Sequence, residues 1–164
     1  MTKSEANLME AFAGESQANR KYLAFAKKAE QEGFQQVAKL FRAAAEAETV
    51  HAHNHFRELG GIKGTRENLE AAISGESFEF QQMYPKMLRE AEEEGNKKAI
   101  KTFTYANEVE KVHADLYKKA LEKLGGNSDS EYYVCQICGY TAEHEAPDKC
   151  PVCQAGKNSF RKID

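Results

Sequence analysis

Apolar residues recur every three or four positions through the first 124 residues of the chain. Near the N-terminus they are Leu8, Ala11, Phe12, Tyr22, Phe25, Ala26 and Ala29. This spacing places apolar side chains along one face of an α-helix. Glycines interrupt the pattern at residues 33, 60–61, 95 and 125–126. The chain is therefore predicted to form four helices, at residues 3–32, 34–59, 66–94 and 96–124.

Capping signals stand at two of the predicted helix starts. Thr2 and Glu5 have the spacing of a capping box, and Thr65 stands where the third helix needs an N-cap. Four long helices joined by short turns favour an antiparallel four-helix bundle. The longer link at residues 60–65 would be its crossover.

The helical region is an internal repeat. The tripeptide GES at residues 14–16 recurs at residues 75–77, an offset of 75 − 14 = 61, whereas Glu48 matches Glu110 with an offset of 110 − 48 = 62. One residue is therefore inserted in the third helix, between Ser77 and Gly95, in an interval that contains Pro85. We predict a kink or a π-bulge there, a feature often found at functional sites. The repeat also predicts a pseudo-twofold axis.

Each repeat contributes one lone glutamate and one Glu-x-x-His pair. These residues are Glu15, Glu48 and His51 in the first repeat and Glu76, Glu110 and His113 in the second. Residues three apart share a helix face, so each pair can point at one site. A single such pair is usually exposed, but two lone glutamates and two Glu-x-x-His pairs on four helices form the ligand set of ferritin-like di-iron or di-manganese bundles. Burying this many carboxylates without metal would be unfavourable, which favours a metal site.

Glu79 makes the two repeats unequal, because Ala18 stands at the matching position. It follows Glu76 by three residues and so shares the metal-facing side of its helix. Hard oxygen ligands stabilise ferric iron, whereas imidazole suits ferrous iron. We hypothesise that one iron exchanges His51 for Glu79 on oxidation.

The four cysteines all lie between residues 135 and 153. Two Cys-x-x-Cys pairs, Cys135 with Cys138 and Cys150 with Cys153, predict a tetrahedral metal site, and their spacing is compatible with both zinc and iron. In so short a module the metal must supply much of the folding energy. We therefore predict a bundle domain at residues 1–126, a linker at 127–131 and a metal-binding domain at 132–164.

The charge and apolar content of the chain argue against nucleic acid and membrane as partners. The formal net charge is −3, from 23 basic and 26 acidic residues, and the chain has no basic run, so nucleic acid is not expected as a partner. The N-terminus lacks the apolar core of a signal peptide, and no segment has the roughly 20 apolar residues of a membrane helix. A soluble cytoplasmic protein is expected. No Gly-rich nucleotide motif follows a strand, so the chain is not expected to bind NADH itself.

With these motifs the whole chain resembles the rubrerythrin family. The stretches that carry the resemblance are GES at 14–16, AETVH at 47–51, GESFEFQQMYP at 75–85, EKVH at 110–113 and CQICGY…APDKCPVC at 135–153. The resemblance implies a mainly α, ferritin-like di-iron four-helix bundle followed by a small rubredoxin-like β/loop domain. It implies two non-haem irons and one Fe(Cys)₄ centre. The implied iron ligands are Glu15, Glu48, His51, Glu76, Glu79, Glu110 and His113 in the bundle, with Cys135, Cys138, Cys150 and Cys153 in the small domain.

The resemblance also implies roles for three further residues. Tyr22 and Tyr84 match family tyrosines that hydrogen-bond the carboxylates. Gln154 is a departure, because rubredoxin-like turns usually have glycine after the last cysteine. A side chain there is expected to affect an N–H···S bond and the reduction potential, but not the ligation.

The activity implied by the resemblance is the reduction of hydrogen peroxide to water, as protection against oxidative stress. Electrons would reach the di-iron site through the Fe(Cys)₄ centre, from an NAD(P)H-dependent reductase or a rubredoxin. Glu110 lies 14 residues before Leu124, about 21 Å along a helix, so the small domain's iron is expected far from the di-iron site of its own chain. A head-to-tail homodimer would bring the two centres together. The alternatives are a ferroxidase or iron-handling ferritin-like protein, and an electron carrier with structural zinc.

Overall fold

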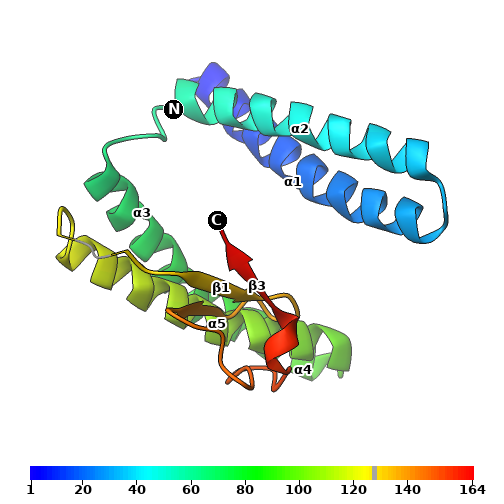
Figure 1. The fold of residues 1–164 in the computed structure, drawn as a ribbon. Coiled ribbons are helices and arrows are strands. Elements are labelled where there is room, and N and C mark those ends of the chain that lie inside the picture. The colour runs from blue at the N-terminus through cyan, green and yellow to red at the C-terminus, as the bar shows by residue number, and fades with distance from the viewer. Residues whose placement is uncertain (127–128) are drawn as a thin grey trace. The chain divides into compact units, whose positions relative to one another are not determined.

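The structure, a computed structural model, describes residues 1–126 and 129–164 (Figure 1). Its helices are α1 (Lys3–Gln31), α2 (Gln35–Glu58), α3 (Thr65–Phe78), the π-helix η1 (Glu79–Met83), α4 (Tyr84–Glu93) and α5 (Lys97–Glu122). The strands are β1 (Tyr132–Cys135), β2 (Thr141–Glu143) and β3 (Phe160–Ile163), with the short 3₁₀ helix η2 (Lys157–Ser159) before β3. The expected mainly helical class with a small β module is confirmed. The chain forms two compact units, residues 1–63 and 64–164.

The first unit is the antiparallel hairpin of α1 and α2. Its contacts pair early residues of α1 with late residues of α2, as in the stacked rings of Phe12 and Phe56, whose centroids lie 4.8 Å apart. Nearer the turn, Asn19 donates from Nδ2 to the carbonyl of Ala45, at 2.7 Å. The predicted capping box is confirmed, since the Glu5 N–H donates to Thr2 Oγ1 and the Thr2 N–H donates to Glu5 Oε2.

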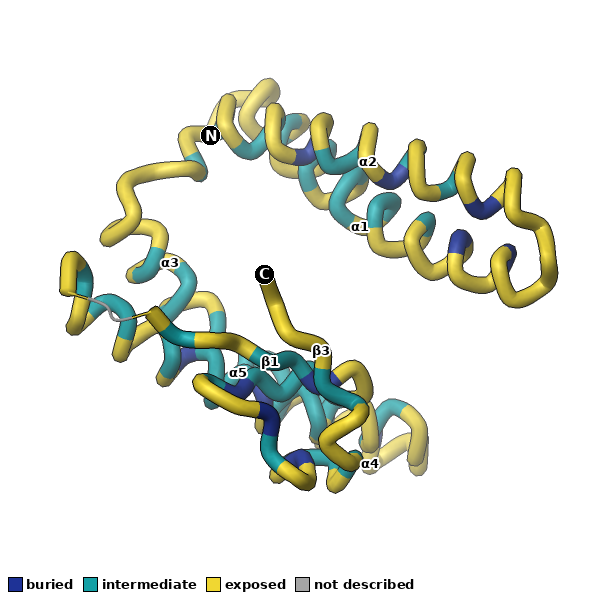
Figure 2. Tube along the Cα trace, in the orientation of Figure 1, coloured by how far each residue is buried: buried dark blue, intermediate teal, exposed yellow. Residues whose placement is uncertain are grey.

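Figure 2 shows scattered buried positions along α1 and α2 of this hairpin, and the residues at these positions are all small. Within residues 1–63, the buried residues are Ala26, Ala29, Ala38, Ala45 and Ala52. Alanines let the two helix backbones approach closely, but they bury little apolar area. Phe25 and Leu40 keep 47% and 67% of their surface exposed. The hairpin therefore presents larger apolar side chains that its own two helices do not cover.

The second unit begins with a matching hairpin, in which α3, η1 and α4 pack against α5. Asn96 caps α5 by accepting the Ala99 N–H at Oδ1, at 3.2 Å. The prediction of Thr65 as the N-cap of α3 is wrong. Gly64 holds the N-cap position and its N–H is bound by Glu67 Oε2, at 3.1 Å, so Thr65 is the first residue of the helix.

The π-helix η1 lies inside the interval where the repeat predicts one inserted residue. It spans Glu79–Met83 and is followed by Pro85 in the first turn of α4. A π-turn absorbs one extra residue without breaking the helix, and a proline in a helix lacks the N–H that a regular turn would use. The predicted bulge is therefore confirmed, with Glu79 as its first residue.

The C-terminal module is a three-stranded antiparallel sheet in the order β2-β1-β3. Tyr140 and Phe160 pack edge to face, with ring centroids 6.4 Å apart, and Cys135 and Cys150 are the most deeply buried side chains. A sheet this small has little apolar core, so the cysteine cluster forms its centre. The predicted linker at residues 127–131 lies partly outside the described residues.

Within the second unit, the module lies alongside α5. Lys119 Nζ is 3.8 Å from Glu143 Oε2, and Thr141 Oγ1 is 3.0 Å from His113 Nε2. The iron of the module was expected far from the di-iron site of its own chain, but the contact of Thr141 with His113 places the module beside one predicted ligand of that site. That expectation assumed that the chain continues outward beyond α5. Among the described residues, no helix has the length and apolar character required to cross a membrane.

Candidate metal centres

The first hairpin brings Glu15, Glu48 and His51 together. One ligand atom of each lies within 4.8 Å of the others. His51 Nδ1 is 2.9 Å from Glu48 Oε2 and 3.9 Å from Glu15 Oε1. Glu48 and His51 meet because they are three residues apart on α2, and Glu15 faces them from α1.

The second hairpin repeats this geometry with Glu76, Glu110 and His113. His113 Nδ1 is 2.7 Å from Glu110 Oε2 and 3.9 Å from Glu76 Oε1. The distances match those of the first hairpin within 0.2 Å. In both hairpins Nδ1 is the histidine nitrogen that faces the carboxylates, which fits a cation held by imidazole and carboxylate donors. We call these two sets of three residues the half-sites.

The second half-site is the more enclosed. The side chain of His113 is 28% exposed, against 54% for His51, because the C-terminal module lies beside His113. Burial, with the nearby charge of Glu110, raises the pKa of Glu76 to about 7. The hydrogen bond to Glu110 raises the pKa of His113. Without metal, the raised pKa values of Glu76 and His113 favour their protonated forms. A bound cation would displace these protons.

These pKa shifts predict that the metal-free protein loses stability as the pH rises. Between pH 4.5 and about 7, folded Glu76 holds a proton that the unfolded chain has released, so the free energy of unfolding falls across this window. The raised pKa of His113 acts in the same direction above its ordinary value of 6.5. We expect a total loss of about 2 kcal/mol, measured by urea unfolding of chelated protein at several pH values. Glu76→Gln should flatten the dependence, and an unchanged slope in that variant would contradict the assignment.

Glu79 lies beside the second half-site rather than within it. Burial and the charge of Glu110 raise the pKa of Glu79, so the two carboxylates lie within electrostatic range of each other. Burial, followed by the charges of Glu79, Glu110 and Glu76, raises the pKa of Tyr84, so the Tyr84 hydroxyl lies within electrostatic range of these carboxylates. Tyr22, which was expected to have the matching role, packs against the rings of Phe25 and Phe41.

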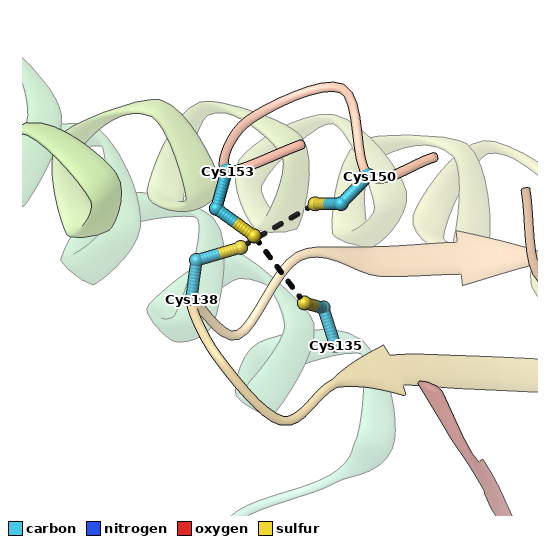
Figure 3. Close-up of side chains that lie close together, drawn as sticks. All are labelled: Cys135, Cys138, Cys150 and Cys153. Atoms are coloured by element: carbon cyan, nitrogen blue, oxygen red, sulfur yellow. Dashed lines mark hydrogen bonds between the residues drawn. The ribbon is translucent and has the colours of Figure 1, made fainter. Parts of the chain in front are cut away.

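The four cysteines converge at the tip of the module (Figure 3). The Sγ atoms of Cys135 and Cys153 are 3.6 Å apart, and those of Cys138 and Cys150 are 3.5 Å apart. A tetrahedron with metal–sulfur bonds of about 2.3 Å has edges of about 3.8 Å, so the cluster has room for one ion. No S–S bond is present among these cysteines. The predicted set of four thiol donors is thus assembled.

Backbone amides support the thiolates. Burial raises the pKa of Cys135, but the N–H groups of Ile137 and Cys138 together with the Cys153 and Cys138 thiols lower it by more, so the net shift is downward. Each Cys-x-x-Cys pair is followed by a residue with positive φ, Gly139 at 87° and Gln154 at 62°. Each of these residues donates its N–H to the carbonyl of the first cysteine of its pair, at 2.9 Å. Gln154 therefore adopts the left-handed conformation that glycine occupies in the first turn.

Thr141 joins the cysteine module to the second half-site. Its hydroxyl lies 3.0 Å from His113 Nε2, the ring nitrogen opposite the one that faces Glu110. It also donates to the carbonyl of Gly139, the residue that follows Cys138, at 3.3 Å. A hydrogen bond to the outer nitrogen orients a ligand histidine and fixes its tautomer. Thr141 could not be identified from the sequence, because a threonine in a short strand carries no sign of this contact.

Two family models match the chain, one over the helical region and one over the cysteine module. Residues 6–121 match the family model Rubrerythrin, and residues 133–161 match the model Rubrerythrin, rubredoxin-like domain. Nigerythrin of Nitratidesulfovibrio vulgaris is 38% identical over 94% of this chain and 83% of its own. Rubrerythrin-2 of Clostridium acetobutylicum is 36% identical over 94% of this chain and 93% of its own.

A solved structure described as the fully reduced, all-ferrous state of nigerythrin is similar to this chain at a TM-score of 0.61. It is 35% identical, with 99% of this chain and 88% of that chain covered. The glutamate and histidine half-sites and the four-cysteine cluster are the donor sets of the family's di-iron site and of a rubredoxin-like iron site. The chain therefore belongs to the rubrerythrin family, as an iron protein with a ferritin-like helical region and a rubredoxin-like module.

Proposed function

We propose that the protein is a non-haem di-iron peroxidase that reduces hydrogen peroxide to water and so protects against oxidative stress. The reaction balances as H₂O₂ + 2 H⁺ + 2 e⁻ → 2 H₂O. The iron pair, when bound, supplies both electrons in one encounter, and the iron of the four-cysteine site returns them singly. An NAD(P)H-dependent reductase or a rubredoxin provides the electrons. Residues 1–126 form the di-iron domain and residues 132–164 the electron-transfer domain.

The protein's own side chains hold and orient the iron pair. The proposed ligands are the two half-sites with Glu79. Carboxylate oxygens suit ferric iron and the two Nδ1 atoms suit ferrous iron, so this mixed set can serve both oxidation states. Thr141 restrains His113 from the side away from the metal.

The observation that carries the proposal is the contact between His113 and Thr141. It places a donor of the carboxylate cluster next to the strand that follows the Cys135–Cys138 turn. Iron storage would have no use for an attached electron-transfer centre, which favours the peroxidase over a ferroxidase. A structural zinc in the four-cysteine site would serve neither electron delivery nor turnover.

Stopped-flow mixing of the reduced protein with hydrogen peroxide, without oxygen, tests the proposal. Oxidised Fe(Cys)₄ is red and bleaches on reduction, whereas zinc is colourless. We expect peroxide to restore the red absorption and the di-iron absorption together, with one peroxide consumed per two electrons. Sustained uptake of added ferrous iron without peroxide consumption would favour the iron-handling function. A colourless protein with zinc in the four-cysteine site would contradict the relay.

Glu79→Ala tests the extra carboxylate. Its removal takes away the oxygen donor proposed to replace His51 on oxidation, so turnover of peroxide should fall about tenfold, equivalent to about 1.4 kcal/mol of barrier. Iron content should remain, because the two half-sites are intact. The matched control is Glu70→Ala, at an exposed glutamate of α3. Full peroxide turnover in Glu79→Ala would refute the exchange of His51 for Glu79.

A further inference from the structure

The two histidines of the half-sites differ in what holds the ring nitrogen that points away from the carboxylates. His113 Nε2 lies 3.0 Å from Thr141 Oγ1, and the backbone of Gly139 is a further hydrogen-bond partner of this ring. Both partners belong to the segment that leads from the Cys135–Cys138 turn into β2. His51 Nδ1 has the same contacts with its own glutamates, but its Nε2 has no hydrogen bond among the described residues.

The hydroxyl of Thr141 has a single proton, and in this structure that proton points to Gly139. Thr141 Oγ1 donates to the Gly139 carbonyl at 3.3 Å, so the lone pairs of the oxygen remain for His113. His113 Nε2 must then carry the hydrogen of that 3.0 Å contact, which leaves Nδ1 of the neutral ring without one. Nδ1 is the nitrogen that faces Glu110, at 2.7 Å. Thr141 therefore selects the tautomer in which His113 can bind a metal through Nδ1.

Packing beside the ring supports the same restraint. Gly139 has a φ of 87°, and a Cβ placed on it would lie 3.8 Å from Cγ1 of Val109, which is buried on α5 one helical turn before His113. The His113 side chain is also about half as exposed as that of His51. Rotating the His113 ring would break its bond to Thr141, whereas rotating the His51 ring breaks no such bond among the described residues.

We propose that Thr141 is a positioning residue that keeps His113 on its metal in both oxidation states, so that only His51 can exchange for a carboxylate. This inference rests on the proposed function, in which one iron exchanges His51 for Glu79 on oxidation. Two imidazoles at equivalent repeat positions are chemically alike, and oxidation favours oxygen donors over both. The Thr141 bond makes them unequal, because releasing His113 costs a hydrogen bond that releasing His51 does not.

The exchange of ring N–H hydrogens with solvent tests the restraint in the unmodified protein. In the fully reduced, iron-loaded protein, ¹⁵N-labelled histidine gives paramagnetically shifted N–H signals from the metal-bound rings. We expect one of the two signals to exchange about tenfold more slowly than the other, because Thr141 accepts the Nε2–H of His113. Two signals that exchange equally fast overturn the proposal, whatever the variants show.

Thr141→Val removes the hydroxyl but keeps the branched side chain that suits a strand. Its slow N–H signal should become as fast as the other. Its affinity for ferrous iron, measured by competition with a chelator, should fall about tenfold or more, as when a ligand histidine loses its outer partner. The red absorption of the four-cysteine iron shows whether the module stays folded. Unchanged N–H exchange and iron affinity in Thr141→Val overturn the proposal.

Two further variants separate loss of the hydrogen bond from general damage to the module. Thr141→Ser keeps the hydroxyl, so both measurements should stay within about twofold of the unmodified protein. Thr104→Val is the matched control, since it removes an exposed hydroxyl that bonds only to the Ile100 carbonyl of its own helix. It should leave both measurements unchanged. A Thr141→Ser protein that behaves like a red, folded Thr141→Val protein contradicts a role for the hydroxyl.

Crystal structures of the fully reduced and the peroxide-oxidised protein decide which histidine stays. We expect His113 Nδ1 on its metal in both structures and His51 on its metal only in the reduced one. Departure of His113, or retention of both histidines, overturns the proposal. Peroxide consumption is measured separately. A protein that shows the slow N–H signal and its loss in Thr141→Val, but consumes no peroxide, refutes the proposed function and leaves the restraint of His113 by Thr141 standing.

Discussion

Replacing Glu110 with alanine is expected to lower peroxide turnover at least about a hundredfold. Glu110 holds His113 through a 2.7 Å contact and is a major cause of the raised pKa of Glu76, so it is the side chain on which this half-site is organised. The substitution removes the carboxylate of Glu110 as a metal donor, and it frees the His113 ring from the contact that holds it. Iron analysis and anaerobic peroxide consumption should both show the defect, with the red absorption of the four-cysteine iron retained.

The matched control for this substitution is Glu108→Ala. Glu108 lies on the same helix, is exposed, and pairs with Lys111 across one turn. An exposed pair of this kind contributes little, so iron content and turnover should stay within about twofold of the unsubstituted protein. A Glu110→Ala protein with its iron pair and turnover preserved would exclude the second half-site as a metal site.

Cys150→Ser is expected to remove the metal of the four-cysteine site and unfold the module while sparing the helices. Cys150 is fully buried at the centre of the module, and the sheet has little other core. Metal binding in such small domains contributes about 10 kcal/mol or more to folding, so losing one thiolate removes most of their stability. The red absorption should disappear, and turnover with a reductase should fall at least about a hundredfold.

The proposed di-iron site can be tested separately in the same variant. After chemical reduction, Cys150→Ser should still consume one equivalent of peroxide in a single turnover, because its di-iron ligands are unchanged. Lys149→Ala, at the exposed neighbouring residue, should keep both the colour and the turnover. Undiminished reductase-linked turnover in Cys150→Ser would show that electrons bypass the module.

Elements with a strong local signal were predicted well from the sequence. Glycines with positive φ, such as Gly33 and Gly95, end the first helix of each hairpin within two residues of the prediction. The change in repeat offset located the π-helix, because an inserted residue has to be absorbed somewhere in a helix that stays continuous. Thr65 was misassigned because the N-cap at Gly64 is stabilised from Glu67, which supplies the reciprocal half of a capping box.

Contacts between segments that are far apart in the sequence could be predicted only where helix geometry or the repeat fixes them. Helical periodicity placed Glu48 with His51, and the repeat placed Glu15 opposite them, since both relations follow from helix geometry. The path of the chain after α5 has no periodic signal, so the position of the module beside His113 was not foreseen. Tyr22 is matched to Tyr84 by the repeat, and each ring lies 6.2 Å from the equivalent phenylalanine, Phe41 for Tyr22 and Phe103 for Tyr84.

The π-helix η1 absorbs one extra residue while the two repeats stay aligned. The repeats stay aligned on both sides of η1, since Glu76 still matches Glu15 and Glu110 still matches Glu48. Each residue turns an α-helix by about 100°, so deleting the extra residue would swing the Ala91 seam of α4 away from α5. The insertion therefore had to be absorbed as a bulge, and Glu79 opens that bulge. Under the proposed function, the carboxylate of Glu79, which has no counterpart at Ala18, would make the two metal positions inequivalent toward an incoming oxidant.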